Sequence, residues 1–344
     1  MRVVLADPPA FTPLYDHELG AALARAGAEV ELVTSRFRFG DVPEPAGYER
    51  RELFYPLSSR VFGRSPLRLP VKALEHPLGL ARLARLRADV VHVQWLTPEL
   101  DDRLLRHRSP LVLTAHDLLP RRTAAKTELW RRLFGRFEQI VVHSERGRGV
   151  LAAFGLPEGK LRVIPHPVSP SDPERADDGR TVLALGMIRP YKQVEHAAEA
   201  ARLAGARLLV AGDPVGPLPE LDGAELRLGY LSSGQIERAL GEATVAVFPY
   251  RAELDQSGAL LQALGAGVPA VVYDVGGLAE PVRAFGAGRV VPADDVAALG
   301  AAIAELLDDA GELEAARAGA RRARAELTWD VAAQAHLALY RELL

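Results

Sequence analysis

The sequence contains no cysteine among its 344 residues, and this absence excludes disulfides, thiolate nucleophiles and cysteine-based metal sites. It also contains no apolar run that approaches the 18 residues of a membrane-spanning helix. The N-terminal stretch MRVVLADPPA has an uninterrupted run of only four apolar residues before Asp7, too few for the core of a signal peptide. We therefore expect a cytoplasmic protein.

Three glycine-containing motifs are absent as well. The stretch ADPPAFTPLYDHEL after the first predicted strand lacks the G-x-G-x-x-G pattern of dinucleotide binding. Neither a P-loop nor the G-x-S-x-G turn of the α/β-hydrolases occurs anywhere in the chain. The nine histidines are scattered without an H-E-x-x-H pair, so we predict neither a metal site nor a bound cofactor.

Charge is unevenly distributed along the chain. The overall net charge of −3 argues against nucleic-acid binding and against disorder. Residues 1–167 carry 26 Lys and Arg against 19 Asp and Glu, a net charge of +7, whereas residues 168–344 carry a net charge of −10. This asymmetry suggests a charged partner for the first half. Only four of the 42 basic residues are lysines, and an excess of arginine is typical of a GC-rich bacterial genome.

Short apolar runs alternate with stretches of helical periodicity throughout the sequence. Runs rich in Val, Ile and Leu without polar alternation indicate strands that are covered on both faces, as in a parallel sheet. Repeated strand–helix–strand units predict doubly wound α/β domains. The predicted strands are residues 3–6, 29–34, 90–93, 111–115, 140–143 and 161–164, then 181–186, 206–212, 226–229, 245–250, 270–274 and 288–292.

A segment rich in proline, aspartate and serine, residues 164–179, separates the two series and is predicted to be an exposed linker. Two α/β domains of similar size should therefore meet near residue 168. The last stretch, residues 328–344, has the pattern of one amphipathic helix. In such domains ligands bind at the carboxyl ends of the strands and at helix N-termini, so functional residues are expected just after strands.

Three strand ends in the second half carry suitable residues. Arg189 and Lys192 follow Gly186 and could clamp a diphosphate. A solvated turn with ordinary surface cations would have the same sequence pattern. Gly276 and Gly277 could expose N–H groups to an anion, with Glu280 in the next helix turn; Glu280 could instead only complement the helix dipole.

The stretch DQSGALLQALGAGVP, residues 255–269, predicts a helix that begins near Ser257 and Gly258. The free N–H groups of its first turn could meet phosphate or sugar hydroxyls. Gln262 lies one turn further on the same face, as a ligand contact or as a polar residue that the helix edge tolerates. Glu253 and Asp255 could bind sugar hydroxyls or be solvated.

Polar and aromatic residues follow the strands of the first half. His116 and Asp117 come directly after a predicted buried strand, the position of an active-site imidazole, although capping or hydrogen bonding could equally explain a histidine there. A neighbouring strand end carries His92, Gln94 and Trp95.

Several stretches, in their order and spacing, resemble the GT-B glycosyltransferases of the retaining family 4 type. The resemblance covers nearly the whole chain and implies an α/β GT-B fold of two Rossmann-like doubly wound domains that face each other across a cleft. It implies that residues 1–167 bind the acceptor, residues 168–327 bind the nucleotide-sugar donor, and helix 328–344 crosses back to the first domain. The stretches are TAHDLLP, GMIRPYKQVEHAAEA, LLVAGDP, LGYLSSGQIERALGEATVAVFPY, SGALLQALGAGVPAVVYDVGGLAEPV and TWDVAAQAHLALYRELL.

Roles follow from the resemblance position by position. It implies catalytic roles for His116, Arg189, Lys192 and Asp255. Donor binding is expected from Gly186, Arg189, Lys192, Tyr230, Leu231, Ser257, Gly258, Gln262, Gly276, Gly277 and Glu280. Acceptor binding is expected from Tyr15, Asp16, His17, His92, Trp95 and Asp117.

Two departures from the family pattern stand out. Many relatives carry two glutamates with seven residues between them, which correspond to Leu254 and Gln262 here. A glutamine can hydrogen-bond ribose hydroxyls, though more weakly than a carboxylate. Relatives often have a glycine pair in the first loop, where this chain has PPAFTPLYDHE, so Tyr15, Asp16 or His17 would supply acceptor contacts instead.

The resemblance implies a hexosyl-type transferase of the EC 2.4 class that uses a UDP- or GDP-sugar, acts with retention and needs no metal. The hydroxyl acceptor would belong to a polysaccharide, a lipid-linked glycan or a natural product. The alternatives are a sugar-nucleotide epimerase and a GT-B nucleotide-binding protein with altered catalysis.

The basic segment 60–136 suggests a peripheral contact with the inner face of a membrane. Residues 45–136 carry 18 Lys and Arg against 9 Asp and Glu. A basic helix with Trp130, Leu133 and Phe134 would suit an anionic lipid surface, and a solvated helix is the alternative.

Overall fold

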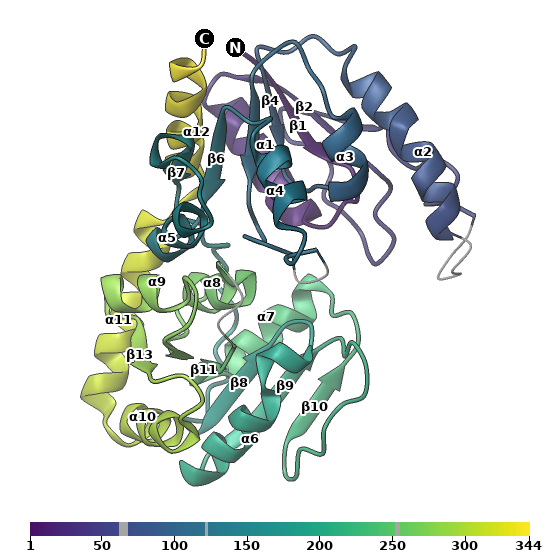
Figure 1. The fold of residues 1–344 in the computed structure, drawn as a ribbon. Helices are drawn as coiled ribbons and strands as arrows, with labels where there is room; N and C mark the ends of the chain where they lie inside the picture. Colours follow the sequence, from purple (N-terminus) through teal and green to yellow (C-terminus); the bar gives the residue numbers. More distant parts are fainter. Residues whose placement is uncertain (62–67, 121–122, 252–254) are drawn as a thin grey trace. The chain divides into compact units, whose positions relative to one another are not determined.

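The chain folds into two compact α/β units in a computed structural model that describes residues 1–61, 68–120, 123–251 and 255–344 (Figure 1). The first unit comprises Met1–Pro165 and Trp329–Leu344, and the second comprises His166–Thr328. Each unit is built on one parallel sheet with helices around it. The predicted α/β class with two doubly wound sheets is confirmed.

The sheet of the first unit has the strand order β3-β2-β1-β4-β5-β6-β7 within the described residues. The order reverses direction between β1 and β4, which makes this the point where a doubly wound sheet offers a ligand site at its carboxyl edge. Its strands are β1 (Arg2–Asp7), β2 (Glu29–Thr34), β3 (Glu49–Glu52), β4 (Val90–Val93), β5 (Leu111–Thr114), β6 (Gln139–Val142) and β7 (Leu161–Val163). Its helices are α1 (Pro13–Arg25), α2 (Arg68–Leu83), α3 (Pro98–Leu104), α4 (Thr127–Phe134), α5 (Glu145–Ala153), the short η1 (Glu158–Lys160) and α12 (Trp329–Glu342).

Two separate cores cover the two faces of this sheet. Successive residues of a strand point to opposite faces, so Val3 and Leu5 of β1 join one core while Val4 and Ala6 join the other. The first core also contains residues of α1 and α12, and the second contains residues of α2, α4 and α5. The all-apolar run of β1 is therefore the direct consequence of burial on both faces.

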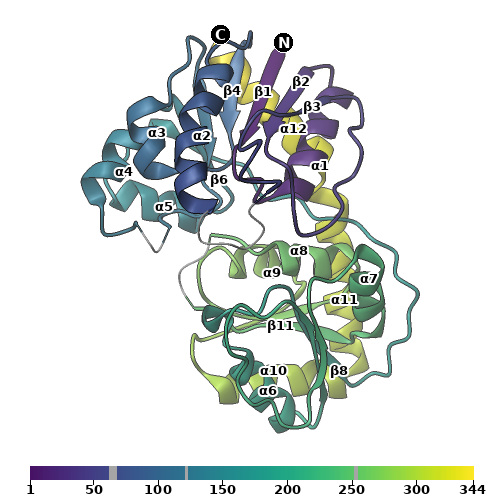
Figure 2. The same ribbon diagram turned by 90° about the vertical axis from the view of Figure 1, so that its right-hand side faces the viewer.

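The C-terminal helix α12 is part of the first unit, where it packs against α1 (Figure 2). Trp329 meets the ring of Tyr15 edge-on, with 5.0 Å between the ring centroids. An ion pair of 2.6 Å joins Arg25 to Asp330. Residues from the two ends of the chain thus complete one core.

The sheet of the second unit has the strand order β10-β9-β8-β11-β12-β13 within the described residues. Its direction reverses between β8 and β11. The strands are β8 (Thr181–Leu185), β9 (Arg207–Gly212), β10 (Glu225–Leu228), β11 (Val245–Phe248), β12 (Ala270–Tyr273) and β13 (Gly288–Val291). The helices are η2 (Pro190–Lys192), α6 (Val194–Leu203), α7 (Ser233–Glu242), α8 (Gly258–Gly265), α9 (Ala279–Phe285), α10 (Val296–Asp308) and α11 (Ala310–Glu326).

Many residues of the predicted exposed linker, residues 164–179, are exposed as predicted, but its backbone is also bonded to the second unit. The backbone N–H of Ser171 donates to Gly265 O at 3.2 Å, and that of Ala176 donates to Gly241 O at 3.0 Å. These approaches require glycine, because an added Cβ would lie 2.1 Å from Ser169 O at Gly265 and 2.2 Å from Glu174 O at Gly241. The proline-rich composition therefore indicates an irregular backbone, but this backbone is held against the second unit.

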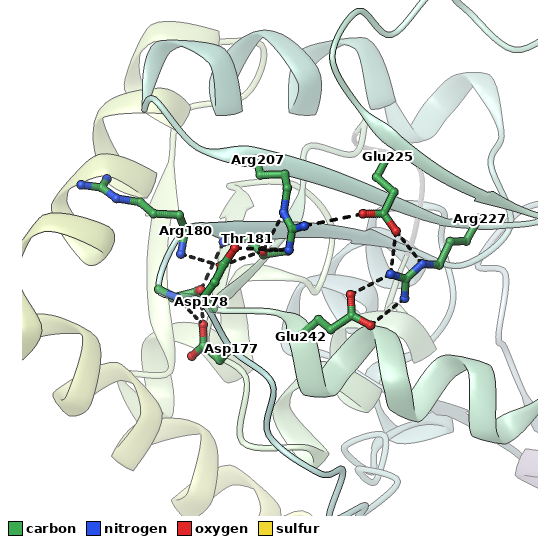
Figure 3. A network of polar contacts seen from close by, with 10 residues as sticks. Asp177, Asp178, Arg180, Thr181, Arg207, Glu225, Arg227 and Glu242 are labelled. Atoms are coloured by element: carbon green, nitrogen blue, oxygen red, sulfur yellow. Dashed lines mark hydrogen bonds and ion pairs between the residues drawn. The ribbon is translucent and has the colours of Figure 1, made fainter.

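A polar network fastens the amino-terminal ends of β8, β9 and β10 (Figure 3). Arg207 donates to Thr181 Oγ1 at 2.7 Å and forms an ion pair of 3.2 Å with Asp178. Arg227 bridges Glu225 at 2.6 Å and Glu242 of α7 at 2.7 Å. The ion pairs thus lie at the edge of the sheet opposite to the carboxyl ends. Within the described residues, no helix is long and apolar enough to cross a membrane.

Candidate functional site

Three loops meet at the carboxyl edge of the second unit's sheet, after β8, β11 and β12. The N–H of Arg251 donates to Tyr191 O at 3.0 Å, which joins the first two loops. The N–H of Gly277 donates to Asp255 O at 2.7 Å, which joins the second loop to the third. Residues that lie far apart in the sequence therefore surround one place.

Lys192 lies at the centre of this place with its ammonium group withdrawn from solvent. Its Nζ lies 4.9 Å from the centre of the Tyr250 ring and donates to Leu185 O at 3.4 Å. Burial above all, with a smaller contribution from the positive charge of Arg189, lowers the pKa of Lys192 to about 8. Arg189, which precedes η2, is exposed. A half-buried cation beside an exposed one is an arrangement that an incoming anion would stabilise.

Glycines allow the loops to approach Lys192. Gly186 has a φ of +97°, and an added Cβ would lie 3.0 Å from Lys192 Nζ. At Gly212, which ends β9, an added Cβ would lie 2.0 Å from Gly186 O. Larger side chains at either position would displace the backbone that carries the lysine.

Helix α8 begins beside these loops with its first turn open. The hydroxyl of Ser257 caps the helix and accepts a hydrogen bond from Leu260 N at 3.3 Å. Gly258 is exposed, and nothing lies within 4 Å of a Cβ added there. Gln262 lies one turn further and is half-buried. The helix start can therefore accept an anion or a hydroxyl group.

The remaining donor residues are placed less uniformly. Gly277 has already given its N–H to Asp255, so the glycine pair does not expose both of its N–H groups as expected. Asp255 itself is 1% exposed, and the structure does not bring its carboxylate to the surface. Glu280 is half-exposed in the first turn of α9, and Tyr230 is 53% exposed after β10, with Leu231 half-buried beside it. Glu253 and Leu254 lie outside the described residues.

In the first unit, an aromatic cluster holds His116 two residues after β5. Its ring stacks on Trp95 with 5.3 Å between the centroids and an interplanar angle of 13°. Its Nε2 donates to Gln94 Oε1 at 3.0 Å, and Tyr15 meets the ring edge-on at 4.7 Å. Asp117 follows and is half-exposed. His116 is thus fixed in orientation at the carboxyl edge of the sheet.

Three of the predicted acceptor residues are not brought to this edge as free side chains. His92 is fully buried, with Nδ1 bonded to Tyr340 Oη at 2.6 Å and Nε2 bonded to Thr114 Oγ1 at 2.7 Å. Tyr15 is 7% exposed and supports His116 from below. His17 is bonded to Tyr48 at 3.0 Å on the side of α1.

Asp16 lines a cavity of about 230 Å³ in the first unit together with Thr34, Ser35 and Arg50. Burial raises the pKa of Asp16 well above its usual value, and the neighbouring carboxylate of Asp7 raises it further. A carboxyl group held neutral can donate a hydrogen bond to a hydroxyl ligand. Among the residues that the structure describes, no group of three or more histidine and acidic side chains could hold a metal ion.

Two family models match the chain one after the other. Residues 15–172 match the family described as Glycosyltransferase Family 4, and residues 179–309 match the one described as Glycosyl transferases group 1. The chain belongs to the family 4, group 1 glycosyltransferases.

Individual relatives agree with this family. The D-inositol 3-phosphate glycosyltransferase of Mycobacterium tuberculosis is 27% identical over 94% of this chain and 76% of its own length. An exopolysaccharide phosphotransferase of Streptomyces coelicolor is 30% identical over 60% of this chain. The chain spans only 24% of the length of that relative, and also 24% of a D-inositol 3-phosphate glycosyltransferase of Catenulispora acidiphila.

Solved structures of glycosyltransferases share the fold along the whole chain. Sucrose-phosphate synthase from Thermosynechococcus elongatus has a TM-score of 0.77 at 20% identity and covers 100% of this chain and 99% of its own. HepE of Anabaena, in complex with UDP-glucose, has a TM-score of 0.70 at 14% identity, with 100% of both chains covered. The fold is therefore the GT-B fold.

Some residues of this family 4 site were not predicted from the sequence. Gln94 was placed at a strand end but not assigned a role, and the structure makes it the hydrogen-bond partner of His116. Tyr250, the last residue of a predicted strand, borders the Lys192 ammonium group. Each lies within two residues of a strand end, which is the signal that could have identified it.

Proposed function

We propose that the chain transfers a sugar from a nucleoside-diphosphate sugar to a hydroxyl acceptor. The observation that carries the proposal is the convergence of Arg189, half-buried Lys192 and the open start of α8 at one edge of the second unit. Two cations and a helix N-terminus are complementary to a diphosphate. The second unit is accordingly the donor-binding unit.

The nucleoside is assigned to the neighbouring loops. Tyr230 and Leu231 would contact the base, and Gln262 would hydrogen-bond the ribose hydroxyls from one turn into α8. Glu280 and Gly276 would contact the ribose and the phosphates from the loop after β12. The presence of UDP-glucose in the HepE complex supports a uridine nucleotide and a hexosyl group, with GDP as the alternative.

We propose that the transfer retains the configuration at the anomeric carbon and that the protein's positive groups neutralise the leaving diphosphate. The acceptor oxygen bonds to the anomeric carbon as the bond from that carbon to the β-phosphate oxygen breaks. The acceptor proton passes to the departing phosphate oxygen on the same face, so no protein general base is needed. Arg189, Lys192 and the α8 N-terminus take up the charge of the leaving diphosphate. Turnover that persists in EDTA would support the assignment of this charge to the protein's own groups.

The first unit would bind the acceptor around His116. Trp95 and Asp117 lie at the same edge, one as an aromatic surface for a sugar and the other as a hydrogen-bond acceptor. Asp16 would contribute from the cavity beside α1. Tyr15 and His17 support this edge, and His92 belongs to the interior.

Nucleotide binding and product analysis test the function together. Thermal shift with UDP, GDP, ADP and dTDP should show stabilisation by one diphosphate well above the others, because ligand binding stabilises the folded state. Incubation with the matching sugar donors should yield a glycosylated acceptor. Appearance of an isomerised donor would favour an epimerase, and binding without turnover would favour a catalytically altered binding protein.

A membrane surface is the partner that we propose for the outer face of α2. The sequence pointed to α4 instead, but Trp130, Leu133 and Phe134 are buried in the core, so that interpretation is wrong. On α2 the exposed apolar side chains follow helical spacing: Pro70, Ala73, Leu74, Leu78 and Ala81.

Charge around this outer face favours anionic lipid. Arg82, Arg85 and Arg87 are exposed at and just after the end of α2, and the one acid of residues 68–87, Glu75, is buried. Leu74 and Leu78 are 76% and 61% exposed.

Flotation with phosphatidylglycerol vesicles should recover the chain at low salt, and Leu74→Gln with Leu78→Gln should abolish recovery. The same change at Leu226 and Leu228, an exposed pair on β10, is the matched control; equal loss there would contradict the assignment. Residues 62–67 and 121–122 of the basic segment lie outside the described residues.

A further inference from the structure

The inner face of α2 begins with two cations that point to the carboxyl edge of the first unit's sheet. Arg68 and Lys72 lie one helical turn apart, ahead of the buried residues of the same face. Lys72 Nζ lies 4.2 Å above the centre of the Tyr55 ring and 5.9 Å from that of Phe11. Arg38, from the connection after β2, is close enough for its charge to lower the pKa of both.

The carboxylates around these cations accept hydrogen bonds from other groups, and Asp7 keeps one oxygen without a partner. Glu75 accepts hydrogen bonds from Leu57 N at 2.7 Å and Ser58 N at 3.1 Å. Asp101 is bonded to His76, and Asp7 accepts from Thr12 N at 3.2 Å. Within the described residues, neither Arg68 nor Lys72 forms an ion pair.

The aromatic ring beneath Lys72 is held in place by a buried chain of hydrogen bonds. Tyr55 Oη is bonded to His76 Nδ1 at 2.7 Å, and His76 Nε2 is bonded to Asp101 Oδ1 at 2.6 Å. Tyr55 also has a φ of +51°, a conformation that costs a non-glycine residue about 1–3 kcal/mol and is concentrated at ligand sites. Among the residues that the structure describes, Lys72 is thus a partly buried lysine without an ion-pair partner, above a strained tyrosine.

A continuous row of rings connects this place to His116. Phe11 meets Trp95 edge-on at 5.2 Å, and Trp95 stacks on His116. Phe11 is 61% exposed although it lies in the middle of the row. An exposed aromatic face between the candidate reaction centre and a group of cations suits a sugar ring that carries an anion at its far end.

We propose that Arg68 and Lys72 form a subsite for a phosphate group on the acceptor, with the acceptor's ring lying on Phe11. Two positive charges match a dianionic phosphate better than a singly charged carboxylate. The inference rests on the proposed function, because it takes the first unit as the acceptor-binding unit. It narrows the acceptor to the phosphorylated hydroxyl compounds.

Calorimetric titration of the full chain with inorganic phosphate tests the subsite. A Lys192→Met background weakens the anion site of the second unit, so the phosphate affinity that is lost when Lys72 is also changed reports on the first unit. Adding Lys72→Met should weaken phosphate at least tenfold, and Lys72→Arg should restore most of the affinity. Arg82→Gln, an exposed cation further along α2, is the matched control and should leave the affinity unchanged.

Unchanged phosphate affinity in the Lys72→Met chain would overturn the proposal, as would an equal loss in the Arg82→Gln chain. Methionine retains the apolar length of the lysine side chain, so we expect each variant to fold. Tryptophan fluorescence during thermal melting checks this. Nucleotide binding by the single Lys72→Met variant should equal that of the parent chain. Should no nucleotide bind the parent while the effect of Lys72 on phosphate persists, the proposed function would fail and the phosphate subsite would stand.

Discussion

The two cations of the second unit differ in a way that only the structure reveals. The sequence places Arg189 and Lys192 three residues apart after a strand, which was sufficient to predict a diphosphate clamp. It could not predict that the ammonium group of Lys192 would lie over the ring of Tyr250, since the tyrosine follows a strand that is distant in the sequence. Lys72 was not predicted at all, because it lies inside a helix and its significance depends on Tyr55 and Phe11. His92 is the opposite case: it was predicted to contact the acceptor, but its side chain is fully buried.

Nucleotide affinity should depend on pH through Lys192. Its pKa of about 8 in the unbound protein is raised by a bound diphosphate, so affinity is full below pH 8 and falls as pH rises above it. The expected loss approaches tenfold per pH unit. Calorimetry with UDP between pH 6.5 and 9.5 measures it. Lys192→Met should bind more weakly and show a flat profile over this range; a profile in the variant that still falls would assign the titration to another group.

Elements were predicted from apolar runs, and β3, the strand that was missed among the described residues, shows the limit of that signal. β3 has the sequence ERRE, with no apolar residue. It forms at the edge of the sheet because it pairs with β2, and Arg51 meets Glu31 of β2 at 2.6 Å. Cross-strand pairs of opposite charge stabilise such a strand without burial. The strands that lie inside both sheets were all found, because burial on two faces leaves a continuous apolar run.

The segment after the first unit provides a prediction about how the second unit is held together. Gly265→Ala should destabilise it by roughly 1–3 kcal/mol, because the new methyl group would lie 2.1 Å from Ser169 O and must displace the segment from α8. Gly234→Ala in α7 is the control, with its nearest atom at 3.8 Å. Circular dichroism melting compares the two variants; equal melting temperatures would show that the segment is not packed on α8.

Acid should unfold the first unit before the second through its buried histidines. His336 of α12 is fully buried beside His92, with 5.1 Å between their rings. Burial lowers the pKa of His336 to about 3 and that of His92 well below its usual value. Since these values lie below the unfolded value of about 6.5, the unfolded chain binds more protons and stability is lost as pH falls below 6.5.

The loss should be about 1.4 kcal/mol per pH unit for each histidine. All three tryptophans belong to the first unit, so their fluorescence during urea unfolding at pH 4.5–7.5 reports on that unit alone. His336→Leu should reduce the slope of the unfolding free energy against pH by the contribution of one histidine. An unchanged slope would mean that His336 is protonated in the folded state.

At the scale of the whole molecule, the account depends on the second unit binding a nucleoside diphosphate through its paired cations. The most direct measurement compares the parent chain with Arg189→Ala/Lys192→Ala in calorimetric binding of the preferred nucleotide and in turnover of its sugar donor. Arg283→Ala, a cation of the same unit that is paired with Asp274, serves as the control. We predict at least a hundredfold weaker binding and no detectable transfer in the double variant, with the control unchanged. Parent-like affinity and turnover in the double variant would contradict the account.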